Sequence, residues 1–298
     1  MSSTAASATA GSDDGDAPDT DIGGDTTRLK QAAVLFGLGL LGVGALVATT
    51  YVQYLGRANL PVSPTVLALL AAVVPTVLLA VAVLLGTVLA PRVGFRSHVA
   101  DRVATGSPVL PKLAAEWRVA AAVGVGLGAV VLLLDFGFQS AFGGVTTTST
   151  VSSNAVLVLL GSIPLRVLYG GITEELLLRW GFMSLVVWLL WNASGFVRRR
   201  RAAGDGASPP TAPAPTSTVV WAGILTAAVA FGAGHLPTLF ALGSTSLPVV
   251  LRTVLLNAIL GVGFGWLFWR RSLEAAMLGH VAFHALVAPV SVLLVLLG

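Results

Sequence analysis

The chain has 298 residues, of which 55% are hydrophobic and only 10% are charged, and its mean hydropathy is +0.89. Soluble domains carry about 25% charged residues, so this composition excludes a water-soluble globular protein. The net charge of +4 does not indicate a nucleic-acid partner, because the basic residues lie between apolar runs and are not interleaved with aromatic residues. The chain has no cysteine, which excludes disulfides, thiolate metal ligands and a thiol nucleophile.

Residues 1–27 form an N-terminal tail that is rich in Ser, Thr, Gly and Asp and contains no apolar cluster. This composition predicts a disordered acidic segment. The tail lacks the basic region and the short apolar region of a signal peptide, so we expect the first span to remain as a membrane anchor.

Seven apolar runs follow, each long enough to cross about 30 Å of hydrocarbon as a helix. They lie at about residues 31–55, 65–90, 117–140, 154–195, 217–241, 247–270 and 272–297. Strands of a transmembrane barrel would alternate in polarity, which these runs do not. The sequence therefore predicts an all-α, polytopic transmembrane helical bundle with seven to eight spans.

The fourth run is too long for one straight crossing and has Gly170 and Gly171 near its middle, where we expect a kink or a re-entrant break. Counted as one net crossing, it puts most inter-span arginines and lysines on one side, as the positive-inside rule favours. The segment at about residues 197–216 has the basic, then Pro-rich composition of a mobile loop. The chain thus divides into the tail at 1–27, a three-span region at 28–153 and a core at 154–298.

Ionisable side chains inside the apolar runs are the candidate functional residues, because each costs at least about 2.5 kcal/mol in a bilayer. Outside the tail, Asp101, Glu116 and Asp205 are expected in loops and Glu274 near a helix start. Asp135, late in the third run, is equally consistent with a carboxylate on a transport pathway and with an interfacial residue at a helix end.

The first candidate group lies in the fourth run. Glu175 and Arg179 are four residues apart, so on a helix they share one face and can pair. Glu174 points about 100° away and is free to face a cavity, where a carboxylate can act as a general base. The alternative is a helix start with Thr173 as its N-cap and two acidic residues in its first turn.

Three histidines form the other candidates. His235 lies late in its span, and an antiparallel hairpin would bring it to the depth of Glu174. His280 and His284 are four residues apart, a spacing that can chelate one divalent metal ion. The alternative for each histidine is a hydrogen bond between helices in the core.

These motifs, in this order and on separate apolar helices, resemble those of the CPBP family of intramembrane proteases, which includes the type II CAAX prenyl endopeptidases. The similarity covers roughly residues 154–295 and includes the stretch from Asn257 to Ala276. The resemblance implies that Glu174 activates the attacking water and that Glu175 and Arg179 complete the first motif.

The resemblance also assigns the histidines. His235 corresponds to the second motif and His280 to the third, whereas His284 stands where the family commonly has Asn. An imidazole at this position can stabilise an oxyanion or bind a metal. A divalent ion, zinc being the candidate, held by His235, His280 and His284 would polarise the scissile carbonyl; without it, Glu174 and the histidines must act alone.

We therefore expect an intramembrane endopeptidase, multi-pass in the cell (plasma) membrane, that hydrolyses membrane-bound or lipid-anchored peptides. A proton- or cation-coupled transporter is the first alternative, because buried titratable groups also form ion paths. The absence of a visible inverted repeat disfavours it. A non-catalytic membrane scaffold is the second alternative.

Overall fold

The computed structural model describes residues 22–142, 155–204, 214–241, 243 and 246–297, and within these ranges it is helical without strands. The elements are α1 (Ile22–Tyr54), α2 (Pro64–Leu89), the 3-10 turn η1 (Pro91–Val93), α3 (His98–Thr105), α4 (Val109–Phe142), α5 (Ala155–Gly161), the π-helices η2 (Leu165–Glu174) and η3 (Leu176–Met183), α6 (Ser184–Gly204), α7 (Ser217–Gly234), α8 (Leu236–Ala241), α9 (Leu247–Arg270) and α10 (Leu273–Leu297).

Seven helical segments are long and apolar enough to cross a membrane. They are Gly24–Tyr54, Pro64–Leu89, Val109–Ala141, Leu159–Arg200, Ser217–Ala241, Leu247–Arg270 and Leu273–Leu294. Each matches one predicted run, so the prediction of an all-α polytopic bundle is confirmed. The chain is an integral, multi-pass membrane protein.

The predicted length of the N-terminal tail, residues 1–27, is wrong, because its last residues are helical. Helix α1 begins at Ile22, and Asp25 in its first turn lies 3.5 Å from the guanidinium of Arg28. A carboxylate in the first turn of a helix is stabilised by the helix dipole, which extends the helix beyond the apolar run. The rest of the predicted tail lies outside the described residues, as does the predicted boundary between residues 153 and 154.

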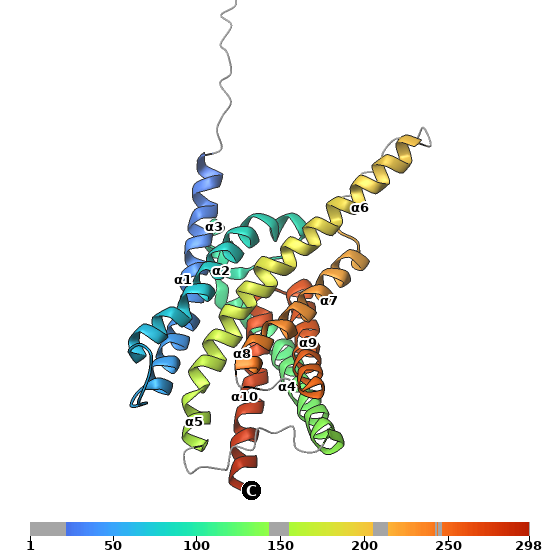
Figure 1. Ribbon diagram of the computed structural model, residues 1–298. Helices are drawn as coiled ribbons and strands as arrows, with labels where there is room; N and C mark the ends of the chain where they lie inside the picture. Colours follow the sequence, from blue (N-terminus) through green and yellow to red (C-terminus); the bar gives the residue numbers. More distant parts are fainter. Residues whose placement is uncertain (1–21, 143–154, 205–213, 242, 244–245, 298) are drawn as a thin grey trace, which may run out of the picture.

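The fourth span does not break at the paired glycines. Instead the chain forms two consecutive π-helices, η2 and η3, and continues into α6 as one long segment (Figure 1). Gly170 and Gly171 allow close packing here: a Cβ on Gly171 would lie 2.5 Å from a methyl group of Val281. π-Helices are rare and are found mostly as single turns at functional sites.

The predicted loop at 197–216 is also partly wrong. Helix α6 includes all four residues of the cluster Arg198–Arg201 and ends at Gly204. Arginine is a good helix former, so the basic cluster continues the helix beyond its apolar part. Residues 205–213 lie outside the described part of the chain.

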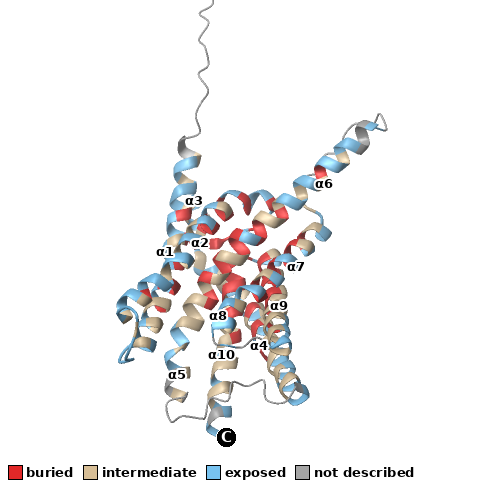
Figure 2. Cartoon of the chain, in the orientation of Figure 1, coloured by how far each residue is buried: buried red, intermediate tan, exposed pale blue. Residues whose placement is uncertain are grey.

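The bundle packs around the π-helical segment. α1 and α2 contact it on one side and α10 contacts it on another, while α4 and α9 pack against α10. The buried residues gather where these elements meet (Figure 2). Large apolar residues on the outer faces are exposed, such as Leu70 and Val74 on α2, as expected for surfaces that contact lipid chains.

Glycine contacts bring the helices close together. A Cβ on Gly86 of α2 would clash with Trp180 of η3, and one on Gly124 of α4 would clash with the backbone carbonyl of Gly279 on α10. Small residues at such positions are typical of helix interfaces in membranes, where van der Waals contact drives association. The three N-terminal spans therefore pack directly against the helices that carry the candidate site residues.

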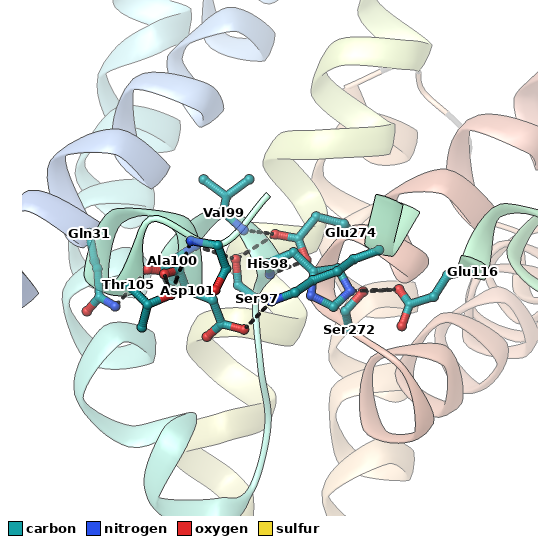
Figure 3. Close-up of polar contacts among 12 residues, drawn as sticks. Gln31, Ser97, His98, Val99, Ala100, Asp101, Thr105, Glu116, Ser272 and Glu274 are labelled. Atoms are coloured by element: carbon teal, nitrogen blue, oxygen red, sulfur yellow. Dashed lines mark hydrogen bonds and ion pairs between the residues drawn. The ribbon is translucent and has the colours of Figure 1, made fainter. Parts of the chain in front are cut away.

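A buried polar cluster, not predicted from the sequence, joins α3 to the start of α10 (Figure 3). The carboxylate of Glu274 accepts hydrogen bonds from Ser97 Oγ (2.6 Å), the backbone N–H of His98 (2.9 Å) and that of Val99 (3.0 Å). It thus satisfies free N–H groups at the start of α3 and places a negative charge at the positive end of that helix.

Glu116 extends the same cluster on the side of α4. Its Oε2 accepts from Ser272 Oγ (2.5 Å) and lies 3.1 Å from His98 Nε2 (Figure 3). The predictions that Glu116 and Asp101 lie in loops are wrong, because α4 starts eight residues before the apolar run and Asp101 belongs to the short helix α3. Both helices are too polar at these positions to be recognised as part of a span.

Candidate active site

Glu175 is the centre of the candidate site. Its side chain is fully buried, and Oε1 lies 3.2 Å from Nη1 of Arg179, so the pair predicted from the four-residue spacing is confirmed. The same oxygen lies 2.8 Å from Nδ1 of His280 on α10. One carboxylate thereby joins the fourth span to the last.

Arg179 also contacts groups on α7 and α9. Its Nη2 donates to the backbone carbonyl of Gly261 on α9 at 3.3 Å. The guanidinium carbon lies 4.9 Å from the ring centre of Phe231 and 5.6 Å from that of Phe264, distances at which cation–π attraction operates. The buried positive charge therefore has both a carboxylate and two aromatic faces, which fixes the position of Glu175.

The contact with Glu175 orients His280. A carboxylate that is paired with arginine is ionised and only accepts hydrogen bonds, so Nδ1 of His280 carries the proton and Nε2 is left with a lone pair. The ring also stacks on Phe264, with centres 4.6 Å apart and planes inclined by 23°. A carboxylate behind a histidine is the usual device that fixes the tautomer of a reactive imidazole.

His284 stacks beside His280, with ring centres 5.0 Å apart and planes inclined by 24°. Both rings aim Nε2 at Gly170: a Cβ built there would lie 3.0 Å from Nε2 of His284 and 3.5 Å from Nε2 of His280. The missing side chain of Gly170 thus lets two imidazole nitrogens approach the backbone of η2. We call the region where these two nitrogens meet Gly170 the Gly170 space.

The surroundings of Nδ1 indicate which tautomer His284 adopts. Nδ1 is buried and has no hydrogen-bond partner among the described residues. A buried N–H without a partner is rarer than a buried acceptor without one, so the proton belongs on Nε2. The two rings then present a donor, on His284, beside an acceptor, on His280.

Glu174 is half-buried, and its side chain makes no hydrogen bond or ion pair with any described residue. It lies within electrostatic range of Glu175 and Tyr169. The interpretation that one carboxylate of the pair is neutralised by Arg179 while the other stays free agrees with this arrangement. A carboxylate without a hydrogen-bond partner can accept a proton from water.

His235 lies at the C-terminal end of α7, where the span breaks before α8. Its Nδ1 donates to the carbonyl of Phe231 at 2.8 Å, so Nε2 is an acceptor here too. The ring of Phe231 lies 5.0 Å from that of His235 and 6.0 Å from that of His280. The structure gives no direct hydrogen bond between His235 and Glu174.

The structure gives little support for the expected metal site. No group of three or more His, Asp or Glu side chains able to hold a metal ion occurs among the described residues. Zinc sites use at least three protein ligands, whereas the pair His280 and His284 supplies two. The three predicted ligands, His235 included, do not form such a group among the described residues, and we build no step of the chemistry on a metal.

Two arginines inside the spans, Arg252 and Arg166, were not among the predicted site residues. A charged residue in an apolar run nevertheless indicates a functional or structural role. Arg252 of α9 pairs with Asp135 of α4, whose other oxygen accepts from Gln139 at 3.0 Å. Asp135 therefore serves as a link between helices and not as part of the candidate site. Arg166 lies on η2 and donates from Nε to Ser162 Oγ at 3.0 Å.

The fold and this site define a membrane-embedded helical protein with a buried carboxylate–imidazole centre. Residues 152–286 match the family model described as type II CAAX prenyl endopeptidase Rce1-like. Over these residues the chain is similar to that family, which confirms the resemblance to the CPBP proteases and supports an intramembrane endopeptidase of the CAAX type. The search of curated proteins and that of solved structures found no match.

Proposed function

We propose that the protein hydrolyses a peptide bond by means of a water activated by Glu174 and held in the Gly170 space. The observation that carries the proposal is the convergence of two imidazole Nε2 atoms, one a donor and one an acceptor, on that space. Peptide hydrolysis needs an activated water, a donor for the oxyanion and a proton for the leaving amine.

The roles follow from the protonation states. Glu174 takes one proton of the water, while the lone pair on Nε2 of His280 accepts a hydrogen bond from the same water and orients it. The oxygen attacks the scissile carbonyl carbon, and the N–H at Nε2 of His284 stabilises the oxyanion. Protonated Glu174 then gives its proton to the leaving nitrogen as the C–N bond breaks, which restores the carboxylate.

Glu175 and Arg179 are positioning residues in this scheme. Glu175 holds the proton of His280 at Nδ1, and Arg179 keeps Glu175 ionised. His235, with its free acceptor nitrogen, provides a further hydrogen-bond acceptor for the water or for the leaving amine.

The proposed substrates are lipid-anchored or otherwise membrane-bound proteins of the cell membrane. Because the matched family is described as a prenyl endopeptidase, a prenylated peptide is the first probe. The transporter and scaffold alternatives gain no support from that match. The expected divalent metal stays a prediction: chelation by 1,10-phenanthroline that abolishes cleavage, restored by zinc, would support it.

The direct test compares new protein N-termini in membranes from cells that carry the wild type, no copy or Glu174→Gln. We expect termini that appear only with the wild type, and these also identify the substrate. Equal expression of the two forms is checked by blotting. Identical termini in all three samples would contradict the proposal.

A further inference from the structure

The fourth membrane segment is longer than a crossing requires. Leu159–Arg200 has 42 residues, whereas about 20 helical residues cross the hydrocarbon of a bilayer. Its last part, α6, projects from the body of the bundle at the end of the molecule opposite the C-terminus (Figure 1). The final turns of α6 therefore lie beyond the hydrocarbon, at the level of the lipid headgroups or in water.

These turns combine basic and apolar side chains. We call residues 196–200, Phe-Val-Arg-Arg-Arg, the arginine end of α6. Phe196 and Val197 are 52% and 47% exposed, and Arg199 and Arg200 are exposed as well. Exposed apolar side chains beside arginines are typical of a helix at a membrane interface, because the apolar groups contact acyl chains while the charges contact headgroups.

The guanidinium groups of the arginine end have no carboxylate partner among the described residues. Arg198 donates from Nη1 to Ser194 Oγ at 3.2 Å, and the guanidinium carbon of Arg200 lies 4.7 Å from the ring centre of Phe196. A hydroxyl and an aromatic ring carry no negative charge. Three consecutive positive charges thus remain without an anion.

A second basic group lies at the same end of the bundle, where α9 ends and α7 begins. Arg270 and Arg271 are exposed and form no ion pair within the described part of the chain. The guanidinium carbon of Arg270 lies 4.2 Å from the ring centre of Trp269, whose ring meets that of Trp221 edge to face at 5.9 Å. Tryptophan is enriched at membrane interfaces, so this pair marks the level of the headgroups on α7, a helix that α6 contacts.

We propose that the arginine end of α6 binds the headgroup phosphates of anionic lipids, with Arg270 and Arg271 as a second point of contact. The guanidinium fork matches phosphate oxygens with two parallel hydrogen bonds, and a basic cluster directly after a membrane span is typical of anionic-lipid binding. The occupant is a lipid and not a soluble anion, because acyl chains cover the exposed apolar surface of Phe196 and Val197. This binding site does not depend on the proposed chemistry.

The test compares the full-length wild type with two variants that lose the same charge. The first variant changes the arginine end of α6 and is R198Q/R199Q/R200Q. The control changes three exposed arginines elsewhere and is R28Q/R57Q/R118Q. Each purified protein is titrated in detergent with phosphatidylglycerol or with phosphatidylcholine of the same acyl chains, and bound lipid is counted by native mass spectrometry. Circular dichroism and Tm establish that the variants are folded.

We expect the wild type to bind phosphatidylglycerol at least about tenfold more tightly than phosphatidylcholine, because each arginine near anionic headgroups contributes about a fivefold gain. The variant of the arginine end should lose this preference, and the control should keep it. An equal preference in the wild type and in the variant of the arginine end would overturn the proposal. Displacement of the lipid by an equal concentration of glycerol 3-phosphate would show a site for a soluble anion and would also overturn it.

A second measurement uses the wild type alone and so decides the question even if the variants fail to fold. The protein is placed in nanodiscs of either lipid, and cleavage by trypsin after Arg198–Arg200 is compared with cleavage after Arg57, which lies between α1 and α2. Headgroups bound to the arginine end should make the first cleavage several-fold slower, relative to the second, in phosphatidylglycerol than in phosphatidylcholine. The same ratio in both lipids would contradict the proposal.

Discussion

Nδ1 of His280 and Oε1 of Glu175 lie 2.8 Å apart, although 105 positions separate the two residues in the sequence. Both side chains are buried, so the contact is screened little by solvent. It sets the tautomer of His280, and through Arg179 it links α10, the π-helical segment and α9. The candidate chemistry and the packing of the bundle therefore depend on the same carboxylate.

Replacement of Glu175 by Gln should destabilise the protein strongly. The change leaves the buried guanidinium of Arg179 without its counter-charge, a loss that costs about 3 to 5 kcal/mol in buried pairs. Thermal unfolding in detergent would show a large fall in Tm. Asp25→Asn, which removes the exposed pair with Arg28, is the matched control and should change Tm little. A Tm equal to that of the wild type would contradict the role of Glu175.

Gly170→Ala should inactivate the enzyme without unfolding it. The added methyl group would occupy the Gly170 space, 3.0 Å from Nε2 of His284, and would displace water and substrate. We expect kcat/KM to fall at least about 100-fold, because misplacement by about 1 Å already costs that much. Gly161→Ala in the same span meets no atom within 4 Å and should retain activity. Equal activity of the two variants would exclude this space as the reaction site.

Substitutions of His284 test its role as a donor. Asn keeps an N–H that can reach an oxyanion, so His284→Asn should retain activity within about tenfold. His284→Ala removes the donor and should lower kcat by about 10²- to 10³-fold, as for other oxyanion donors. The comparison is made on purified variants of equal Tm. Equal reductions of kcat in His284→Asn and His284→Ala would contradict a role for a hydrogen bond donated from this position.

Glu274→Gln should loosen the junction between α3 and α10. The carboxylate accepts three hydrogen bonds, and an amide can replace the acceptors at only one of its two oxygens (Figure 3). We expect a loss of about 1.5 to 3 kcal/mol in unfolding free energy, the usual value for buried bonds to a charged group. Asp101→Asn breaks the more exposed pair with Lys112 and serves as the control. Faster hydrogen exchange confined to α3 and the start of α10 would locate the effect.

Much of the bundle could be predicted from the sequence because the bilayer imposes a length. A helix must present about 20 apolar residues to cross, so all seven spans were visible as runs. The pair of Glu175 and Arg179 was equally visible, since a spacing of four residues brings side chains together on any helix. Polar stretches such as α3 and the first turns of α4 carry no such signal and were missed.

The sequence by itself determined the class of fold, the family resemblance of residues 152–286 and the pair of Glu175 and Arg179. Only the tertiary structure decided that His280 binds Glu175, that Glu274 binds the start of α3, and that Gly170 leaves a space for two imidazoles. The reason is that these contacts join residues on different helices, and the relative positions of helices depend on how their surfaces pack. Local spacing fixes partners within one helix, whereas a reaction site assembled from several helices exists only after they pack.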